Sequence, residues 1–144
     1  MSLLLERRYR FSAAHRYHRP EWSPEENWRR FGKCSYEPGH GHNYILVVRI
    51  TGEPDPETGF LVDLPELDRV VEERVLESLD HRHLNDSVER FGPSGQIPSS
   101  ENLVLWIRDR LLSSLPATVR LSALELRESD DLGAIWTAPA NPAS

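Results

Sequence analysis

Polar and apolar residues alternate at the beginning of the chain, which is typical of a β-strand with one buried face. Over residues 3–11 the side chains separate into two rows, an apolar row of Leu3, Leu5, Tyr9 and Phe11 and a charged row of Glu6, Arg8 and Arg10. Residues 43–52 (NYILVVRITG) are rich in β-branched and aromatic side chains and predict a second strand. Residues 119–128 and 132–137 predict two further strands.

Between the two pairs of strands, apolar residues recur at the three- and four-residue spacing of amphipathic helices. The first predicted helix has Asp63 as its cap and extends to about Leu79. The second has Ser99 or Ser100 as its cap and extends to about Leu112. Neither segment approaches the ~18–20 consecutive apolar residues of a membrane-spanning helix.

The predicted order of elements is ββααββ, which favours an α+β fold with a four-stranded antiparallel sheet and two helices on one face. The strand over residues 43–52 is apolar on both of its sides. We therefore expect an uncovered apolar sheet face, and from it a homo-oligomer. We expect a single domain over residues 1–137 and a loose tail over residues 138–144 (APANPAS).

The composition narrows the choice of partners. The 144 residues include 17 Lys and Arg against 23 Asp and Glu, a formal net charge of −6. This acidic balance argues against nucleic acid as the main partner, because phosphate binding depends on surplus basic residues. The apolar start of the chain is too short for a secretory signal, so we expect a cytoplasmic protein with no membrane partner. The single cysteine, Cys34, excludes an internal disulfide.

Three histidines form the most informative pattern. His40 and His42 lie two residues apart at the entry to the second strand, so their side chains point to the same face. His15 follows the first strand, and pairing of the two strands would bring it beside them. A lone His-x-His is common in proteins without any metal, but three imidazoles together are a ligand set that zinc favours. Gly39 and Gly41 flank His40 and permit close approach of the backbone.

Cys34 lies six residues before His40, next to Lys33. A cation beside a thiol lowers its pKa and favours the thiolate. Two roles remain open at this stage. The thiolate can act as a fourth zinc ligand and close a structural site, or it can remain off the metal as a base or nucleophile and leave the site open for chemistry.

Carboxylates supply further candidates. Asp80 precedes His81 directly after the first helix and can orient its imidazole, although a polar helix terminus is the simpler interpretation. Glu128 ends the third strand, where a carboxylate in a pocket can accept two parallel hydrogen bonds from an amidine-like ligand edge. Glu101 lies at a helix N-terminus, where negative charge is favourable for local reasons.

Taken together and in order, these segments resemble the 6-pyruvoyltetrahydropterin synthase family, which includes the bacterial 6-carboxytetrahydropterin synthases. The resemblance covers residues 11–136 and rests on six stretches: FSAAHR (11–16), NWRRFGKCSYEPGHGHNY (27–44), GEPDPETGFLVDL (52–64), LDHRHLN (79–85), PSSEN (98–102) and LRES (126–129). It implies the tunnelling fold, in which sheets of several subunits join into a barrel, usually within a homohexamer.

The resemblance also implies a role for each candidate residue. His15, His40 and His42 would hold Zn²⁺, and Cys34 would be the catalytic base. Asp80 and His81 would complete a triad with Cys34 across a subunit interface. Glu128 would anchor the pterin, and Glu101 lies in a motif that lines the pocket. For the triphosphate, the basic candidates in the sequence are Lys33, Arg16 and Arg82.

The implied reaction converts 7,8-dihydroneopterin triphosphate with elimination of triphosphate and an internal redox rearrangement. Five residues separate Cys34 from the His-Gly-His segment, which looks like the pyruvoyl type. The carboxy type, which releases acetaldehyde and serves the queuosine (deazaguanine) pathway, is the alternative. A zinc-stabilised pterin-binding module without catalysis is an alternative of another class.

Overall fold

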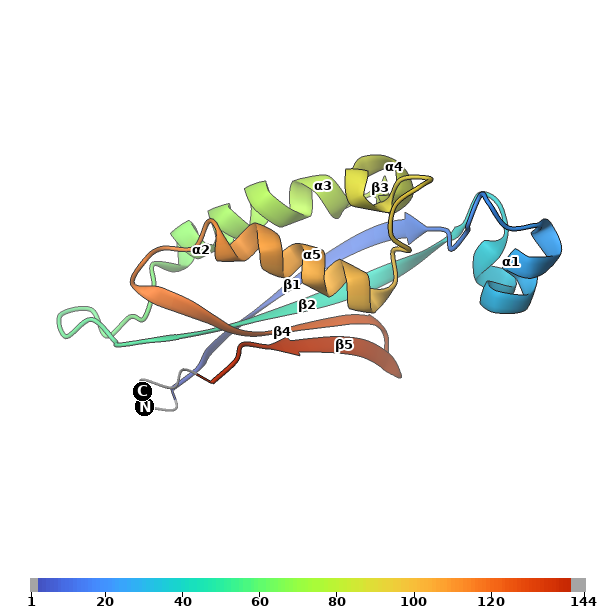
Figure 1. Ribbon diagram of the computed structural model, residues 1–144. Coiled ribbons are helices and arrows are strands. Elements are labelled where there is room, and N and C mark those ends of the chain that lie inside the picture. Colours follow the sequence, from blue (N-terminus) through green and yellow to red (C-terminus); the bar gives the residue numbers. More distant parts are fainter. Residues whose placement is uncertain (1–2, 141–144) are drawn as a thin grey trace.

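A computed structural model describes residues 3–140 and contains one mixed sheet with the strand order β3-β1-β2-β4-β5 (Figure 1). Its strands are β1 (Leu5–His15), β2 (His40–Gly52), β3 (Arg82–His83), β4 (Val119–Ser129) and β5 (Leu132–Thr137). The four long strands are antiparallel neighbours, as the sequence predicts. The expected count of four is wrong, because the two-residue β3 pairs in parallel with β1. A strand this short has no periodicity to detect.

The two predicted helices are present, and each differs in detail from its prediction. The first runs from Leu64 to Leu79 as α2 (Leu64–Val71), a wider π-helical turn η2 (Glu72–Leu76) and α3 (Glu77–Leu79). Asp63 occupies its N-cap position, but its side chain makes no capping hydrogen bond within residues 3–140. The second helix is α5 (Ser100–Leu112), and here the hydroxyl of Ser99 accepts a hydrogen bond from the Asn102 N–H. Between them lie α4 (Leu84–Ser87) and the 3₁₀ turn η3 (Glu89–Phe91).

Helices α2, α3 and α5 cover one face of the sheet, and the core lies between the two layers (Figure 1). Alternate residues of β2 supply its centre: Tyr44, Leu46, Val48 and Ile50 are all at most 1% exposed. Burial of such side chains is the main favourable contribution to folding. The residues between them in β2 point to the opposite face.

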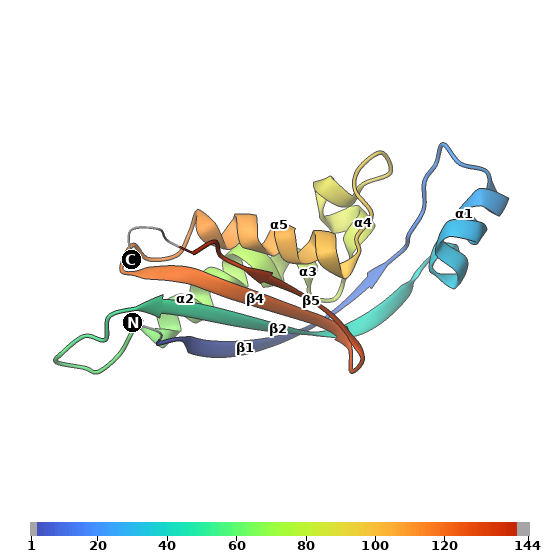
Figure 2. The same cartoon turned by 60° about the horizontal axis from the view of Figure 1, so that its bottom comes forward.

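The opposite face has no helix over it in the described chain (Figure 2), and ion pairs cross its centre. Arg49 of β2 pairs with Glu6 of β1 at 2.9 Å and with Glu125 of β4 at 3.5 Å, and Arg127 pairs with Glu125 at 3.4 Å. Val47 lies among these long side chains and is only 1% exposed. The face is uncovered, as expected, but it is not uniformly apolar, because neighbouring strands supply ion pairs that the sequence of β2 does not reveal. Its apolar residues include Ile135, which lies opposite Glu125 and is 59% exposed.

An arm over residues 16–39 joins β1 to β2 and projects beyond the end of the sheet (Figures 1 and 2). It contains α1 (Pro24–Phe31) and the 3₁₀ turn η1 (Gly32–Ser35), neither of which the hydrophobic pattern predicts. The hydroxyl of Ser23 caps α1 by accepting from the Glu26 N–H. Asn27 is 1% exposed and fixes the turn, since its side chain bonds to Arg19 and to two other backbone carbonyls.

Strand β1 pairs with β2 over the full length of β1, from Leu5 opposite Ile50 to His15 opposite His40. Gly39 permits the last pair of this ladder, His15 with His40, because its backbone lies directly against that of His15. Its φ of +117° disfavours any residue with a side chain, and a Cβ there would contact the His15 carbonyl group, 2.9 Å from its carbon. Gly41 has only an ordinary contact, so the requirement for glycine falls on one side of His40.

The expected tail over residues 138–144 begins inside the described chain, where the Ala138 N–H still donates to the Ser122 carbonyl. Residues 141–144 lie outside the described part. No helix within residues 3–140 has both the length and the apolar composition needed to cross a bilayer.

Replacing Gly39 with alanine is expected to destabilise the protein more than replacing Gly59. Both residues have positive φ, so each variant bears a backbone cost of about 1–2 kcal/mol. Only at Gly39 does the new Cβ meet backbone atoms, which adds about 1–3 kcal/mol of overpacking, whereas Gly59 faces open space. Urea unfolding measures both free energies of unfolding, and equal losses in G39A and G59A would contradict this account.

Candidate metal centre and active site

The register of β1 and β2 brings the three predicted ligands together. His15 lies opposite His40, and Ala13 lies opposite His42, so all three imidazoles are on the helix-facing side of the sheet. The Nε2 atoms of His15 and His40 are 3.2 Å apart. One nitrogen from each ring lies within 4.8 Å of the others, and in the described chain no other His, Cys, Asp or Glu joins this cluster.

His15 is the buried centre of the cluster and is 0% exposed. Its Nδ1 lies 3.1 Å from the Tyr44 hydroxyl, and its ring packs against Tyr17 with centroids 4.7 Å apart. Burial, followed by the neighbouring His40 and His42, lowers the pKa of His15 to about 3. The ring is therefore neutral at physiological pH, which is the state that binds a metal ion.

The residues present fit a zinc ion. Three neutral imidazoles are a donor set found in catalytic zinc sites, which keep a fourth position for water or substrate. Burial also lowers the pKa of His40, with a further contribution from His42. Beside them, Glu128 Oε2 lies 3.7 Å from His42 Nε2. That oxygen is buried and has no hydrogen-bond partner among the described residues, which leaves it available to a ligand.

Cys34 lies on η1 and is not a member of the histidine cluster. This arrangement favours the open site over a closed Cys-His₃ site. The pKa of Cys34 is raised, first by burial and then by the negative charge of Glu128. The expectation that Lys33 lowers this pKa is therefore wrong. Lys33 is exposed, and the nearby charge that the thiol experiences is that of a carboxylate.

Tyr17 connects the arm to the metal centre. Its N–H donates to the Cys34 carbonyl at 2.9 Å, while its ring packs against His15. The pKa of the Tyr17 hydroxyl is raised by burial and then by the charges of Glu128, Cys34 and Glu101. Three of the predicted residues therefore lie within electrostatic reach of one phenol, although they come from η1, the end of β4 and the start of α5.

Asp80 and His81 form a pair directly before β3, on the side of β1 away from β2. Asp80 Oδ1 accepts from the Ser12 N–H at 3.0 Å and lies 2.9 Å from His81 Nδ1. The Ser12 N–H is the largest cause of the lowered pKa of Asp80. His81 has a φ of +59° and an 82% exposed side chain. Such a backbone is uncommon outside glycine and is often found at functional sites.

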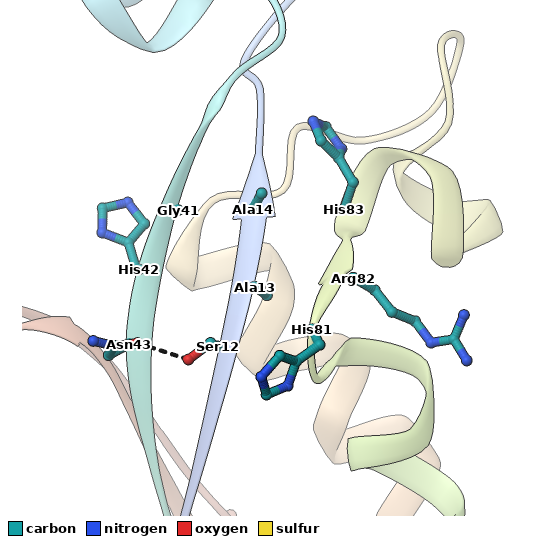
Figure 3. A pocket seen from close by; sticks show the side chains of 9 residues that line it. All are labelled: Ser12, Ala13, Ala14, Gly41, His42, Asn43, His81, Arg82 and His83. Atoms are coloured by element: carbon teal, nitrogen blue, oxygen red, sulfur yellow. Dashed lines mark hydrogen bonds between the residues drawn. The ribbon is translucent and has the colours of Figure 1, made fainter.

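Within the described chain, no hydrogen bond joins Asp80 or His81 to Cys34. His81 instead borders a cavity of about 450 Å³, whose small lining residues include Ala13, Ala14 and Gly41 (Figure 3). This cavity leaves space beside the imidazole for groups from outside the chain.

The three basic residues that are candidates for binding a triphosphate lie in different parts of the structure. Arg16 is held by the Ser35 carbonyl at 2.7 Å and lies 3.4 Å from Glu37, so it is already partnered. Arg82 donates to the Glu77 carbonyl and lines the cavity next to His81. Lys33 is exposed on the arm.

Sequence reasoning missed two tyrosines that contact the metal centre. Tyr44 was detectable, because it lies two residues after His42 in a strand and therefore shares its face. Tyr17 has no such signal. It reaches His15 only because the chain leaves β1 and continues into the arm.

The sequence and the fold match known proteins over almost their full length. Residues 4–139 match the family described as 6-pyruvoyl tetrahydropterin synthase. The 6-pyruvoyl tetrahydrobiopterin synthase of Pongo abelii is 41% identical over 127 residues, which cover 88% of this chain and 86% of that protein. The structure of the Caenorhabditis elegans 6-pyruvoyl tetrahydropterin synthase matches with a TM-score of 0.84 and 34% identity, covering 95% of this chain and 96% of the other.

A more distant relative is described by another activity. The dihydroneopterin monophosphate aldolase of Pyrococcus furiosus is 33% identical over 123 residues, covering 85% of this chain and 87% of that protein. The family match over residues 4–139 includes every strand and helix that positions the histidine cluster, Cys34 and Glu128. The chain belongs to the 6-pyruvoyl tetrahydropterin synthase family.

Proposed function

We propose that this protein is a zinc-dependent lyase of the 6-pyruvoyltetrahydropterin synthase type, acting on 7,8-dihydroneopterin triphosphate. The observation that carries the proposal is the convergence of His15, His40 and His42 with Glu128 at the end of β4, whose buried Oε2 has no hydrogen-bond partner among the described residues. His15, His40 and His42 would hold the ion. When bound, the ion supplies Lewis-acid stabilisation of negative charge that develops on side-chain oxygens of the substrate.

Glu128 would orient the substrate. Its side chain is only 9% exposed, and its Oε2 atom lacks a partner in the described chain. An unpartnered buried carboxylate oxygen is costly, so a ligand that donates hydrogen bonds to it would recover that energy. The aminopyrimidinone edge of a pterin presents two parallel N–H donors, which a carboxylate can accept together. Glu128 would thus hold the pterin ring so that the side chain of the substrate points toward the histidine cluster.

Cys34 would remove a proton from the side-chain carbon next to the pterin ring. As the chain stands alone, burial and Glu128 disfavour its thiolate. A positive group near the sulfur would reverse this effect. We propose that His81, oriented by Asp80, supplies that group from a second copy of the chain, as the family resemblance implies. The cavity beside His81 supports this arrangement, because it leaves room for an incoming loop (Figure 3).

This assignment makes the active form a homo-oligomer, and a hexamer is the assembly that the resemblance implies. After Cys34 removes the proton, the negative charge is delocalised into the pterin ring, and protonation of the ring neutralises it. Triphosphate leaves as the substrate side chain rearranges. The redox change is internal to the substrate, so no redox cofactor is required. Arg82 is the basic candidate on the His81 side, since it lines the same cavity.

Purified protein incubated with 7,8-dihydroneopterin triphosphate is expected to release triphosphate and form the pyruvoyl product. Mass spectrometry of the pterin distinguishes this product from the carboxy product and from a hydroxymethylpterin, which an aldolase would form. C34A is expected to retain its zinc and lose at least ~100-fold in turnover, the usual contribution of a general base. Binding of the pterin without any turnover by the parent protein would indicate a non-catalytic binding module.

Zinc binding is expected to depend on the histidine cluster. H40A removes a ligand, so dialysed protein should lose its stoichiometric zinc in elemental analysis. H18A is the matched control, because His18 lies on the arm outside the cluster. Zinc at 100 times its Kd should stabilise the parent protein by about 2.7 kcal/mol and leave H40A unaffected. Stoichiometric zinc in H40A would refute the ligand assignment.

Removing the charge of Glu128 is expected to lower the pKa of Cys34. E128Q eliminates one of the two causes of the raised pKa and leaves burial in place. The rate of iodoacetamide alkylation against pH reports this pKa directly, because Cys34 is the single cysteine of the chain. E125Q is the control, since Glu125 lies on the same strand and pairs with Arg49 on the opposite face. The measurements use metal-free protein. If the pKa of Cys34 in E128Q equals that of the parent, Glu128 does not lie close enough to influence the thiol.

A further inference from the structure

We infer that the hydroxyl of Tyr44 is a positioning group for the metal centre: it holds His15 in the tautomer and orientation that present Nε2 to the ion. This inference rests on the proposed zinc site and adds a residue to it. It depends on the two ring nitrogens of His15 having different partners, on the burial of Tyr44, and on the rigidity of its surroundings.

The two nitrogens of His15 face in different directions. Nε2 lies 3.2 Å from Nε2 of His40, on the side where the three histidines converge. Nδ1 lies 3.1 Å from the Tyr44 hydroxyl oxygen, away from that point. Nε2 is therefore the ligand atom, and Nδ1 is the nitrogen that a supporting group must control.

The chemistry of imidazole then fixes the direction of the hydrogen bond. A neutral ring carries one proton, and the nitrogen that binds a metal ion must be free of it. With Nε2 as the ligand, the proton lies on Nδ1 and is donated to the Tyr44 oxygen. Partners of this kind fix the tautomer and the ring orientation of histidine ligands, and their loss typically weakens metal binding 10–100-fold.

Tyr44 is suited to this task because its ring is buried and held by stacking. It is 1% exposed, and its ring stacks on Phe11 with centroids 4.8 Å apart and an angle of 7° between the planes. Phe11 and Tyr44 are paired residues of β1 and β2, so the stack is built into the same ladder that aligns His15 with His40. A hydroxyl on this rigid ring loses little conformational entropy when it binds His15.

A second acceptor lies near the ring. The backbone of Pro98, just before α5, lies close enough to the His15 ring to raise its pKa, and the Pro98 carbonyl is an acceptor that the Nδ1 proton can use when the Tyr44 hydroxyl is removed. A carbonyl only accepts, so it stabilises a protonated ring nitrogen and not a bare one. The Pro98 carbonyl remains when the Tyr44 hydroxyl is removed. We therefore expect this removal to weaken zinc binding about tenfold, at the lower end of the 10–100-fold range.

The test compares Y44F with Y9F. Phenylalanine keeps the ring of Tyr44 and its stack on Phe11 and deletes the hydroxyl alone. Tyr9 lies on the same face of the neighbouring strand, and its hydroxyl donates to Asp68 at 2.7 Å, remote from the histidines. Competition with a chromophoric chelator gives the zinc Kd of each protein. Y44F is expected to bind zinc about tenfold more weakly, and Y9F to bind it within twofold of the parent.

Two spectroscopic measurements separate positioning from general stability. Visible absorption bands of the Co²⁺-substituted protein should shift in Y44F and not in Y9F, because the ligand field follows the orientation of His15. Long-range ¹H–¹⁵N NMR of the zinc-loaded parent should show the proton of His15 on Nδ1, a result that requires no variant. Unchanged Kd and cobalt bands in Y44F, or a proton on Nε2, would overturn the inference alone. Failure of the parent to bind zinc would overturn the proposed function together with it.

Discussion

The structure depends on the pairing register of β1 with β2. The two strands are antiparallel over eleven residue pairs, so one alignment fixes the core and the histidine cluster at once. A slip of one residue would turn His40 and His42 toward the uncovered face and expose Tyr44, Leu46 and Val48. Burial of the apolar row of β2 is therefore what positions the three histidines. Gly39 permits the last pair of this ladder, because the backbone of His15 lies against it.

Electrostatics divides the site into two parts. The buried His15 is neutral, which is the state that binds a cation, whereas Cys34 lies near the Glu128 carboxylate, whose charge disfavours its thiolate. In the proposed reaction, the Cys34 thiol would need a nearby positive group before it acts as a base. The exposed His81, oriented by Asp80, lies directly before β3 and has no hydrogen bond to Cys34 within the described chain. This separation supports the proposal that another copy of the chain completes the site.

Residues with a periodic environment were predictable. The four long strands, α5 and the helical stretch from Leu64 to Leu79 each bury one face against the same core, so their apolar residues recur at a fixed spacing. Helix α1 was missed because it projects into the arm and buries few apolar residues, although Ser23 and Glu26 form the expected capping signal. The two-residue β3 and the π-helical turn have no signature in the sequence, since packing alone determines them.

The sequence by itself determined which side chains are available for chemistry and on which face of a strand each one lies. His40 and His42 share a face because β-strands alternate, and this holds before any fold is known. Only the tertiary structure decided what surrounds them: Tyr44 and Tyr17 against His15, Glu128 beside both His42 and Cys34, and ion pairs over the face expected to be apolar. The reason is that a local pattern gives the direction of a side chain, whereas its pKa, its partners and its exposure depend on residues that are distant in the chain.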